Sequence, residues 1–255
     1  MNSPWLNMSQ RIALYKTEAE MDLKTLWRTP GFILPCLAFP VLFYLLFGVM
    51  LSKGQHAEYL LVSYAAFGVM GPALFNFGAN VATERAQGWL TLKQISPAPI
   101  GSWLFGKTLS CLLLALLIIL LLFVCAGAIA GVRLYTSQWL QLAGVLLLGT
   151  IPFCLLGLTL GLTLSSKSAP ASINLIYLPL AFLGGLWLPL QLLPTALQQL
   201  ALVLPSYHLG QLGYAVIGKD RGEPFWVNVA VLVAYSLVFI WLATRRFRAQ
   251  SHDRR

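Results

Sequence analysis

The most regular feature of the chain is a series of six stretches that contain no Asp, Glu, Lys or Arg. They cover residues 29–52, 59–83, 108–132, 134–166, 168–218 and 224–244. A helix of about 20 apolar residues crosses a lipid hydrocarbon core of about 30 Å. Each stretch is long enough for at least one membrane-spanning helix, so the pattern predicts an all-α integral membrane protein.

The stretch 168–218 has 51 residues and has room for two helices, so the charge distribution decides the topology. With six spans, 13 of the 17 Lys and Arg residues fall on the side of both termini and four on the other side. Cytoplasmic loops are enriched in Lys and Arg, which places both termini in the cytoplasm. The predicted spans are about 31–51, 59–82, 108–130, 140–164, 171–189 and 225–244. They form a transmembrane domain, 31–244, between a cytoplasmic segment, 1–30, and a basic tail, 245–255.

The second half of the long stretch is too polar and too rich in proline for a helix that faces lipid. Pro189, Pro194 and Pro205 interrupt it, and glutamine and histidine side chains lie between them. Irregular backbone at membrane depth is tolerated where it packs against protein. Residues 190–213 are therefore predicted to form a re-entrant helical hairpin in the outer leaflet, between the fifth and sixth spans.

The segment before the first span has the pattern of an amphipathic helix. Ile12, Tyr15, Ala19, Leu23 and Leu26 recur at helical spacing, and six charged residues between positions 11 and 24 fall largely on the other faces. We interpret the segment as a helix on the inner membrane surface, anchored by the Trp-Arg pair that follows it. A solvated helix packed on another domain is the alternative.

Composition supports a membrane location and limits the possible partners. Of the 255 residues, 58% are hydrophobic and 10% are charged, whereas soluble domains have about 25% charged residues. The net charge of +9 follows the membrane topology, so we expect the lipid bilayer as a partner and no nucleic acid. All four cysteines lie within apolar stretches, which argues against a disulfide framework.

The predicted spans hold no charged residue at membrane depth. An ion-coupled carrier needs such groups to bind its coupling ion. The three histidines fall in loops or in the tail, and no His, Asp or Glu cluster has the spacing of metal ligands. The sequence therefore gives no support to a secondary transporter or an intramembrane enzyme, and it predicts no metal site and no catalytic residue.

A few polar and small residues stand out within the spans. Asn76 and Asn80 lie one helical turn apart, and Asn174 lies near the inner end of the fifth span. They form either a polar collar at the cytoplasmic entrance of a pathway or hydrogen bonds between helices. Two GxxxG spacings, 127 with 131 and 157 with 161, predict close helix packing.

Residues 101–108, GSWLFGKT, match the GxxxxGK[ST] pattern of a phosphate-binding loop, but their context does not. Such a loop follows a buried strand and needs small residues, so that its backbone N–H groups wrap a phosphate. Here bulky side chains lie inside the motif and an apolar span follows it. We therefore expect no nucleotide or other cofactor in this chain.

The predicted cytoplasmic loop 83–107 contains that motif and carries a family resemblance. It reads ERAQGWLTLKQISPAPIGSWLFGK from residue 84 to residue 107. This resembles the first cytoplasmic loop of the ABC-2 type permeases, the membrane subunits of a class of ATP-binding-cassette exporters. The matching residues are a Glu-Arg pair, a glycine, two leucines, a proline and a Gly-Lys pair, namely Glu84, Arg85, Gly88, Leu90, Leu92, Pro97, Gly106 and Lys107.

A second resemblance covers residues 184–214, which are similar to the outer re-entrant hairpin of the same family. Its landmarks are Pro189, Pro194, Pro205 and Tyr207. The resemblance implies two copies of this permease, or one copy with a close relative, in a bacterial inner membrane. It also implies two separate cytosolic ATPase subunits, which bind ATP and Mg.

Under this resemblance, a short helix from about residue 82 to the Pro-Ala-Pro break would dock on the ATPase and couple its motion to the spans. In this interpretation Glu84 and Arg85 hold the geometry of the loop or pair with the ATPase. The alternative is that they form only a surface ion pair with each other. The family's pathway lies at the permease dimer interface and is lined mainly by the second and fifth spans. The corresponding candidates here are Phe75, Asn76, Asn80, Asn174 and Tyr177.

The uncharged spans suit a hydrophobic or amphiphilic cargo, such as a drug, a lipid or a lipid-linked glycan. Two other readings stay open from the sequence. One is an ATP-independent facilitator, and the other is a membrane anchor or assembly subunit without a pathway of its own.

Overall fold

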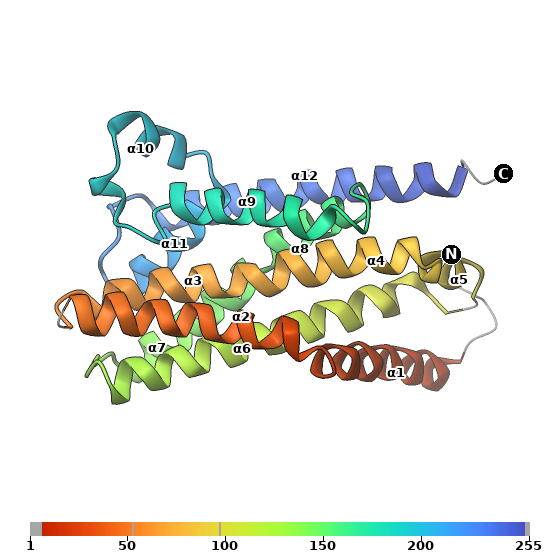
Figure 1. Cartoon of the computed structure of the whole chain (residues 1–255), viewed down its shortest axis with the longest axis horizontal. Coiled ribbons are helices and arrows are strands. Elements are labelled where there is room, and N and C mark those ends of the chain that lie inside the picture. The colour runs from red at the N-terminus through yellow and green to blue at the C-terminus, as the bar shows by residue number, and fades with distance from the viewer. Residues whose placement is uncertain (1–6, 53, 97, 253–255) are drawn as a thin grey trace.

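The computed structural model describes residues 7–52, 54–96 and 98–252 as a bundle of helices (Figure 1). α1 (Met8–Trp27) precedes α2 (Pro30–Phe43), which continues as the π-helical segment η1 (Tyr44–Leu51). The other elements are α3 (Ala57–Phe75), η2 (Asn76–Asn80), α4 (Val81–Ala86), α5 (Trp89–Ile95), α6 (Ile100–Ala128), α7 (Thr136–Gly149), α8 (Ile151–Gly161), α9 (Ala169–Leu183), η3 (Leu190–Leu192), α10 (Thr195–Ala201), α11 (Pro205–Val216) and α12 (Phe225–His252).

Within these described ranges, five helical segments are long and apolar enough to cross a membrane. They are Pro30–Leu51, Ala57–Ala86, Ile100–Ala128, Thr136–Gly161 and Phe225–Ala249. The fifth predicted span, 171–189, corresponds to α9, which has 15 residues and ends at Leu183. At 1.5 Å per residue α9 is about 22 Å long, shorter than the hydrocarbon core. The predicted end at 189 is wrong because Gly185, at a φ of +76°, turns the chain out of the helix.

Two other helices extend beyond the limits of the predicted spans. The third span was expected from residue 108, but α6 begins at Ile100, directly after Pro99. The basic segment 245–255 was expected as a tail, but α12 continues through it to His252. Both helices extend beyond the uncharged stretches, because a charged residue such as Lys107 or Arg245 does not end a helix. Residues 101–108 are helical, so their N–H groups do not wrap a phosphate.

The helices run mostly along the long axis of the molecule (Figure 1). α1, α4, α5 and the last turns of α12 lie at one end, which we name the α1 end. α10, α11 and the start of α7 lie at the other end, which we name the α10 end. The first and last described helices thus end on the same side of the bundle.

α3 forms the centre of the core. It packs against α2, α6, α8, α9 and α11, and 16 of its 19 residues are buried. Gly157 and Gly161 of α8 allow the closest approach, because a Cβ atom there would lie 2.7 Å from the carbonyl oxygen of Ala73 and 2.6 Å from that of Phe77. This GxxxG prediction is confirmed.

The other GxxxG prediction, for Gly127 with Gly131, is wrong. No atom lies within 4 Å of a Cβ atom built on either glycine. Gly131 instead has a φ of +67°, which lets the chain leave α6. A GxxxG spacing therefore predicts packing only where a second helix is close.

The predicted hairpin region 190–213 contains η3, α10 and α11. Pro189 and Pro194 directly precede η3 and α10, and Pro205 is the first residue of α11. Proline is favoured at the start of a helix, where its missing N–H costs nothing. Every residue of α11 from Pro205 to Tyr214 is buried, because the helix packs against α3, α7 and α12.

Candidate functional site

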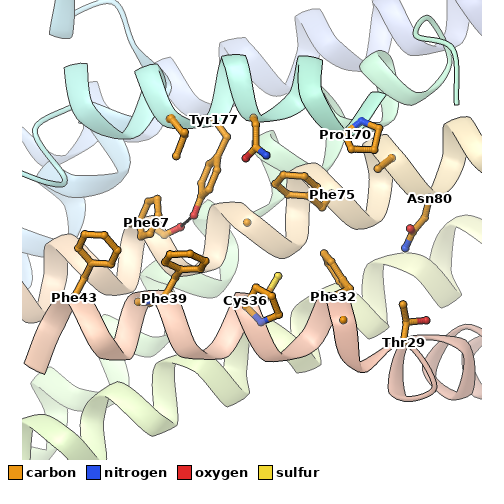
Figure 2. A pocket seen from close by; sticks show the side chains of 18 of the residues that line it. Thr29, Phe32, Cys36, Phe39, Phe43, Phe67, Phe75, Asn80, Pro170 and Tyr177 are labelled. Carbon is orange, nitrogen blue, oxygen red and sulfur yellow. Dashed lines mark hydrogen bonds between the residues drawn. The ribbon is translucent and has the colours of Figure 1, made fainter. Parts of the chain in front are cut away.

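A groove lies between α2, α3 and α9 and has a volume of about 820 Å³. Figure 2 shows its walls, with α2 on one side and α9 on the other. Apolar side chains make up most of the lining, and polar groups enter mainly at the α1 end. The lining consists of Thr29, Gly31, Phe32, Pro35, Cys36, Phe39, Pro40, Phe43, Phe67, Gly68, Gly71, Phe75, Ala79, Asn80, Pro170, Asn174, Tyr177, Leu178 and Trp187.

Aromatic rings follow one another along this groove. Between ring centroids, Phe32 lies 6.4 Å from Phe75, and Phe75 lies 6.2 Å from Tyr177. Tyr177 stacks on Phe67 at 4.9 Å, and Phe67 meets Trp187 at 5.6 Å. The Tyr177 hydroxyl donates to the carbonyl oxygen of Phe67 at 3.0 Å, which ties α9 to α3. We call these five rings the aromatic row.

The structure brings four of the five proposed pathway residues to this groove: Phe75, Asn80, Asn174 and Tyr177. Asn76 lies in a separate polar pocket nearby. The sequence interpretation missed the wall formed by α2. Its signal is the spacing of Phe32, Cys36, Phe39 and Phe43, which repeats every three, four or seven residues and so lies on one helical face.

A polar pocket of about 160 Å³ adjoins the groove at the α1 end. Thr29, Phe32 and Asn80 line both cavities. Asn76 and Asn80 belong to η2, and the Asn80 amide donates to the Asn76 side-chain oxygen at 2.9 Å. π-helical segments within α-helices are frequent at functional sites. The lining consists of Asp22, Thr25, Leu26, Thr29, Phe32, Asn76, Asn80, Thr83, Glu84, Gln87 and Lys107.

Lys107 stands in this pocket as a buried cation, with 1% of its side chain exposed. Its Nζ lies 2.6 Å from Glu84 Oε1 and 3.1 Å from Asp22 Oδ1. The Trp103 indole donates to Glu84 Oε2 at 3.1 Å. We name Asp22, Glu84, Trp103 and Lys107 the charged cluster, which joins α1, α4 and α6. Lys107 directly precedes the predicted third span, 108–130, but it belongs to α6, which begins seven residues before it.

Glu84 and Arg85 are adjacent in sequence but hold different partners. The Arg85 guanidinium donates to the carbonyl oxygens of Leu162 and Leu164, beyond the end of α8. Glu84 pairs with Lys107 on α6. A mutual surface ion pair does not account for these contacts. Glu84 thus ties α4 to α6, whereas Arg85 ties α4 to the turn that follows α8.

The predicted coupling helix is two helices rather than one. α4 ends at Ala86, Gly88 adopts a φ of +82°, and α5 begins at Trp89. A side chain is strained at such a φ, which explains the glycine. Pro97 lies outside the described residues.

The two leucines of α5 face in opposite directions. Leu90 is 3% exposed and packs in the core, whereas Leu92 is 55% exposed. Trp89 and Ile95 are also exposed, at 52% and 76%. Residues three apart share a helix face, so Trp89, Leu92 and Ile95 form an outward apolar surface on α5.

α1 is held tightly against α5 and α6. Lys93 Nζ lies 2.6 Å from both carboxylate oxygens of Glu18. A Cβ atom on Gly106 would lie 2.9 Å from the backbone of Glu18, so the glycine allows the two helices to approach closely. The sequence interpretation placed Glu18 and Asp22 on the solvated faces of α1, but both face the bundle. The signal was present, because Asp22 lies three residues after Ala19 and four before Leu26 on the same face.

Tyr207 belongs to the α10 end. It is buried in a small cluster with Leu190, Leu193 and Ala201, and its hydroxyl donates to Glu223 Oε1 at 2.7 Å. Burial, followed by the Glu223 carboxylate, raises the pKa of Tyr207 above its ordinary value. The described residues contain no group of three or more His, Cys, Asp or Glu side chains that could hold a metal ion.

Sequence comparisons show the family of the chain. The sequence profile of the family described as ABC-2 family transporter protein matches residues 52–245. The chain belongs to the ABC-2 transporter family. It is also 29% identical over 228 residues to a Bacillus subtilis (strain 168) protein named "Putative transport permease YvfS", with 87% of this chain and 92% of that protein covered.

This ABC-2 permease is thus a membrane subunit of an ABC transporter and a multi-pass membrane protein. Permeases of this family work with ATPase subunits and are transport components rather than ATPases themselves. The family match begins at residue 52, so it includes α3–α6 with the loop between α4 and α5, but not α1 or α2.

Proposed function

We propose that this permease is the transmembrane subunit of an ABC exporter and that its cargo moves along the groove between α2, α3 and α9. Two copies form the pathway at their interface, and two copies of a cytosolic ATPase bind ATP and Mg. The α1 end lies in the cytoplasm of a bacterial cell and the spans lie in its inner membrane. The enrichment of Lys and Arg on the terminal side supports this orientation.

The observation that carries the proposal is the outward apolar surface of α5 on a firmly tied frame. Three large apolar side chains point away from the bundle at the α1 end. Behind them, Lys93 ties α5 to α1, and the charged cluster ties α1 to α4 and α6. A force applied to α5 by the ATPase therefore reaches the spans through ion pairs and short helices.

Several features of the groove support a hydrophobic or amphiphilic cargo. Aromatic rings line its length, and the described lining holds no Asp, Glu, Lys or Arg. A ligand site of this kind gains affinity from apolar burial and orientation from a few polar groups. A second permease copy over the groove would complete its walls. The three helices α2, α3 and α9 are thus proposed as the subunit's half of the pathway.

The test is to tag the permease, purify it in mild detergent and measure the co-purified ATPase. Leu92→Glu places a charge on the outward apolar surface of α5, so we expect it to abolish ATPase recovery. Leu192→Glu is the matched control, because Leu192 is also exposed but lies at the α10 end. Full ATPase recovery with Leu92→Glu would overturn the docking role of α5.

A second measurement separates the exporter from the two alternatives. With the ATPase bound, Glu84→Ala should uncouple ATP hydrolysis from cargo, because it removes one partner of Lys107. A facilitator would move cargo without an ATPase, and an anchor subunit would recruit the ATPase without cargo-stimulated hydrolysis. Either result would replace the exporter assignment.

A further inference from the structure

The groove and the polar pocket adjoin each other, and together they offer an apolar body and a polar end. Thr29, Phe32 and Asn80 belong to both linings. In Figure 2, Thr29 and Asn80 lie at one end of the groove, while Phe39, Phe43 and Phe67 lie toward the other. Along α2, the distance from Thr29 to Phe43 is about 21 Å at 1.5 Å per residue. Such a shape matches a molecule with a headgroup at one end and an apolar body at the other.

We propose that the polar pocket binds the ammonium headgroup of an amphiphilic cargo whose apolar body lies along the aromatic row. This assignment rests on the proposed function of the groove and names the chemistry of what the groove carries. Two observations support the position and the positive charge of the headgroup. They are the balance of charge in the pocket and two buried polar atoms without partners.

The pocket has one more negative charge than positive charge. Its lining contains two carboxylates, Asp22 and Glu84, and one cation, Lys107. Lys107 is already bound to both carboxylates, and Glu84 also accepts from Trp103. A partly buried charge is costly unless a group of opposite charge lies near it. A cationic ligand would therefore be stabilised in this pocket, whereas an anionic one would meet repulsion.

Two buried polar atoms of the pocket have no hydrogen-bond partner: Oδ2 of Asp22 and Nδ2 of Asn76. Asn76 is only 2% exposed, so bulk water does not satisfy its amide. Buried polar groups are nearly always paired, and an unpaired one requires an explanation. An ammonium group donates to Asp22 Oδ2, and an oxygen beside the ammonium accepts from Asn76. One headgroup would thus satisfy both atoms.

The aromatic row extends the same preference into the groove. Phe32 borders both cavities, and Phe75 follows it at 6.4 Å. The face of an aromatic ring attracts a cation within about 6 Å, so the entrance to the pocket favours a positive headgroup. Farther along, Tyr177, Phe67 and Trp187 offer mainly aromatic surface to the body of the ligand. The gradient from charge to aromatic surface sets the direction in which an amphiphile enters.

The test uses two fluorescent amphiphiles that share one aromatic body and differ in the charge of the headgroup. Dansylcadaverine carries a primary ammonium, and dansyl-6-aminohexanoic acid carries a carboxylate. Binding is measured by fluorescence on the full chain in lipid nanodiscs. We expect the ammonium probe to bind about tenfold more tightly or better. Equal binding of both probes, or no saturable binding of either, would overturn the proposal.

Variants then locate the headgroup. Asp22→Asn keeps the side-chain shape and removes the excess negative charge, so the preference for the ammonium probe should fall to near unity. Asp220→Asn makes the same change at the α10 end and should leave the preference intact. If Asp22→Asn lowers the melting temperature, Asn80→Leu, on the border of the two cavities, provides the second test. An unchanged preference in both pocket variants would place the headgroup elsewhere.

The results distinguish a failure of the headgroup site from a failure of the exporter assignment. A permease that recovers its ATPase but binds both probes equally retains its function and refutes the headgroup site. A permease that prefers the ammonium probe but recovers no ATPase retains the site and loses the exporter assignment. Occupation of the pocket by water or by an inorganic cation alone gives equal probe binding.

Discussion

The α1 end and the α10 end of the bundle are held together by different kinds of contact. At the α1 end, ion pairs join helices that are far apart in sequence. Lys93 contacts Glu18 at 2.6 Å, and Lys107 contacts Glu84 at 2.6 Å and Asp22 at 3.1 Å. Three helices, α1, α4 and α6, meet at the buried amino group of Lys107.

At the α10 end, hydrogen bonds that involve neutral side chains take over this role. The hydroxyls of Ser63 and Tyr214 lie 2.7 Å apart, and Nε2 of His208 lies 2.9 Å from the Leu202 carbonyl oxygen. Tyr59 stacks on Tyr214 with ring centroids 4.3 Å apart. An ion pair in this region, Lys219 with Glu58, is more open to solvent, with 42% and 35% of the two side chains exposed. Close packing and short hydrogen bonds therefore hold the α10 end.

The difference concerns how each end responds to movement. A Coulomb attraction falls slowly with distance, whereas a hydrogen bond weakens steeply with distance and angle. The α1 end keeps its attraction while its helices shift by a small amount, but the α10 end resists the same shift. If the ATPase docks on α5 as proposed, movement would begin at the α1 end and pivot on the α10 end.

The largest expected effect is the loss of the buried cation. Lys107→Met leaves Asp22 and Glu84 without their shared partner and should lower the free energy of unfolding by about 3–5 kcal/mol. Lys219→Met, in the exposed pair of the α10 end, should cost about 1 kcal/mol or less. Unfolding by SDS in mixed micelles measures both. If both variants lost the same free energy of unfolding, the α1 end would not depend on ion pairs more than the α10 end does.

The next effect tests the close approach of α1 and α6. Gly106→Ala places a Cβ atom 2.9 Å from the backbone of Glu18, which should cost about 1–3 kcal/mol by overpacking. Gly127→Ala is the control in the same helix, where no atom lies within 4 Å. It should be neutral or slightly stabilising, because alanine favours helix over glycine. Hydrogen exchange of α1 should rise only in the first variant, and unchanged exchange there would contradict the close packing.

A smaller effect is expected from the hydroxyl of Tyr207 at the α10 end. Tyr207→Phe removes its hydrogen bond to Glu223 and should cost about 1 kcal/mol at neutral pH. Burial raises the pKa of Tyr207, so the stability it supplies is complete below pH 10 and is lost as the pH rises above the folded-state pKa. Thermal melts at neutral and alkaline pH compare wild type with variant. A variant that loses as much stability as wild type in alkali would disprove this role.

The smallest effect is the response to salt. The Lys93–Glu18 pair is partly exposed, and 1 M salt screens charges beyond about 3 Å. Raising NaCl to 1 M should speed hydrogen exchange in α1 by a few-fold at most, since such a pair contributes about 1 kcal/mol or less. Amides of α11 serve as the internal control, because most of this helix is buried and its side chains are uncharged or aromatic. Equal acceleration in α11 would show that salt acts on the whole bundle.

Local features of the fold were predictable because they depend on neighbouring residues. The apolar stretches located each described helix that is long and apolar enough to cross a membrane, and the prolines at 189, 194 and 205 marked the starts of η3, α10 and α11. Boundaries were less predictable. α6 and α12 extend beyond the apolar stretches because hydrophobicity shows where lipid lies, not where a helix ends.

The candidate site was predictable only in part. Phe75, Asn80, Asn174 and Tyr177 were nominated by resemblance to the permease family, and they do line the groove. The α2 wall was missed because the sequence shows its aromatic face but not which helix it meets. Asp22 was missed for the same reason, since its partner Lys107 lies 85 residues away along the chain.

The sequence by itself determined that this chain is helical and membrane-embedded, and its loop motif pointed to the ABC-2 family. Those properties follow from hydrophobicity and spacing over short stretches. The tertiary structure alone decided that Lys107 is buried between two carboxylates and that a polar pocket adjoins the groove. Cavities and buried ion pairs arise when distant helices meet, and the energy of a charge depends on what surrounds it rather than on its neighbours in sequence.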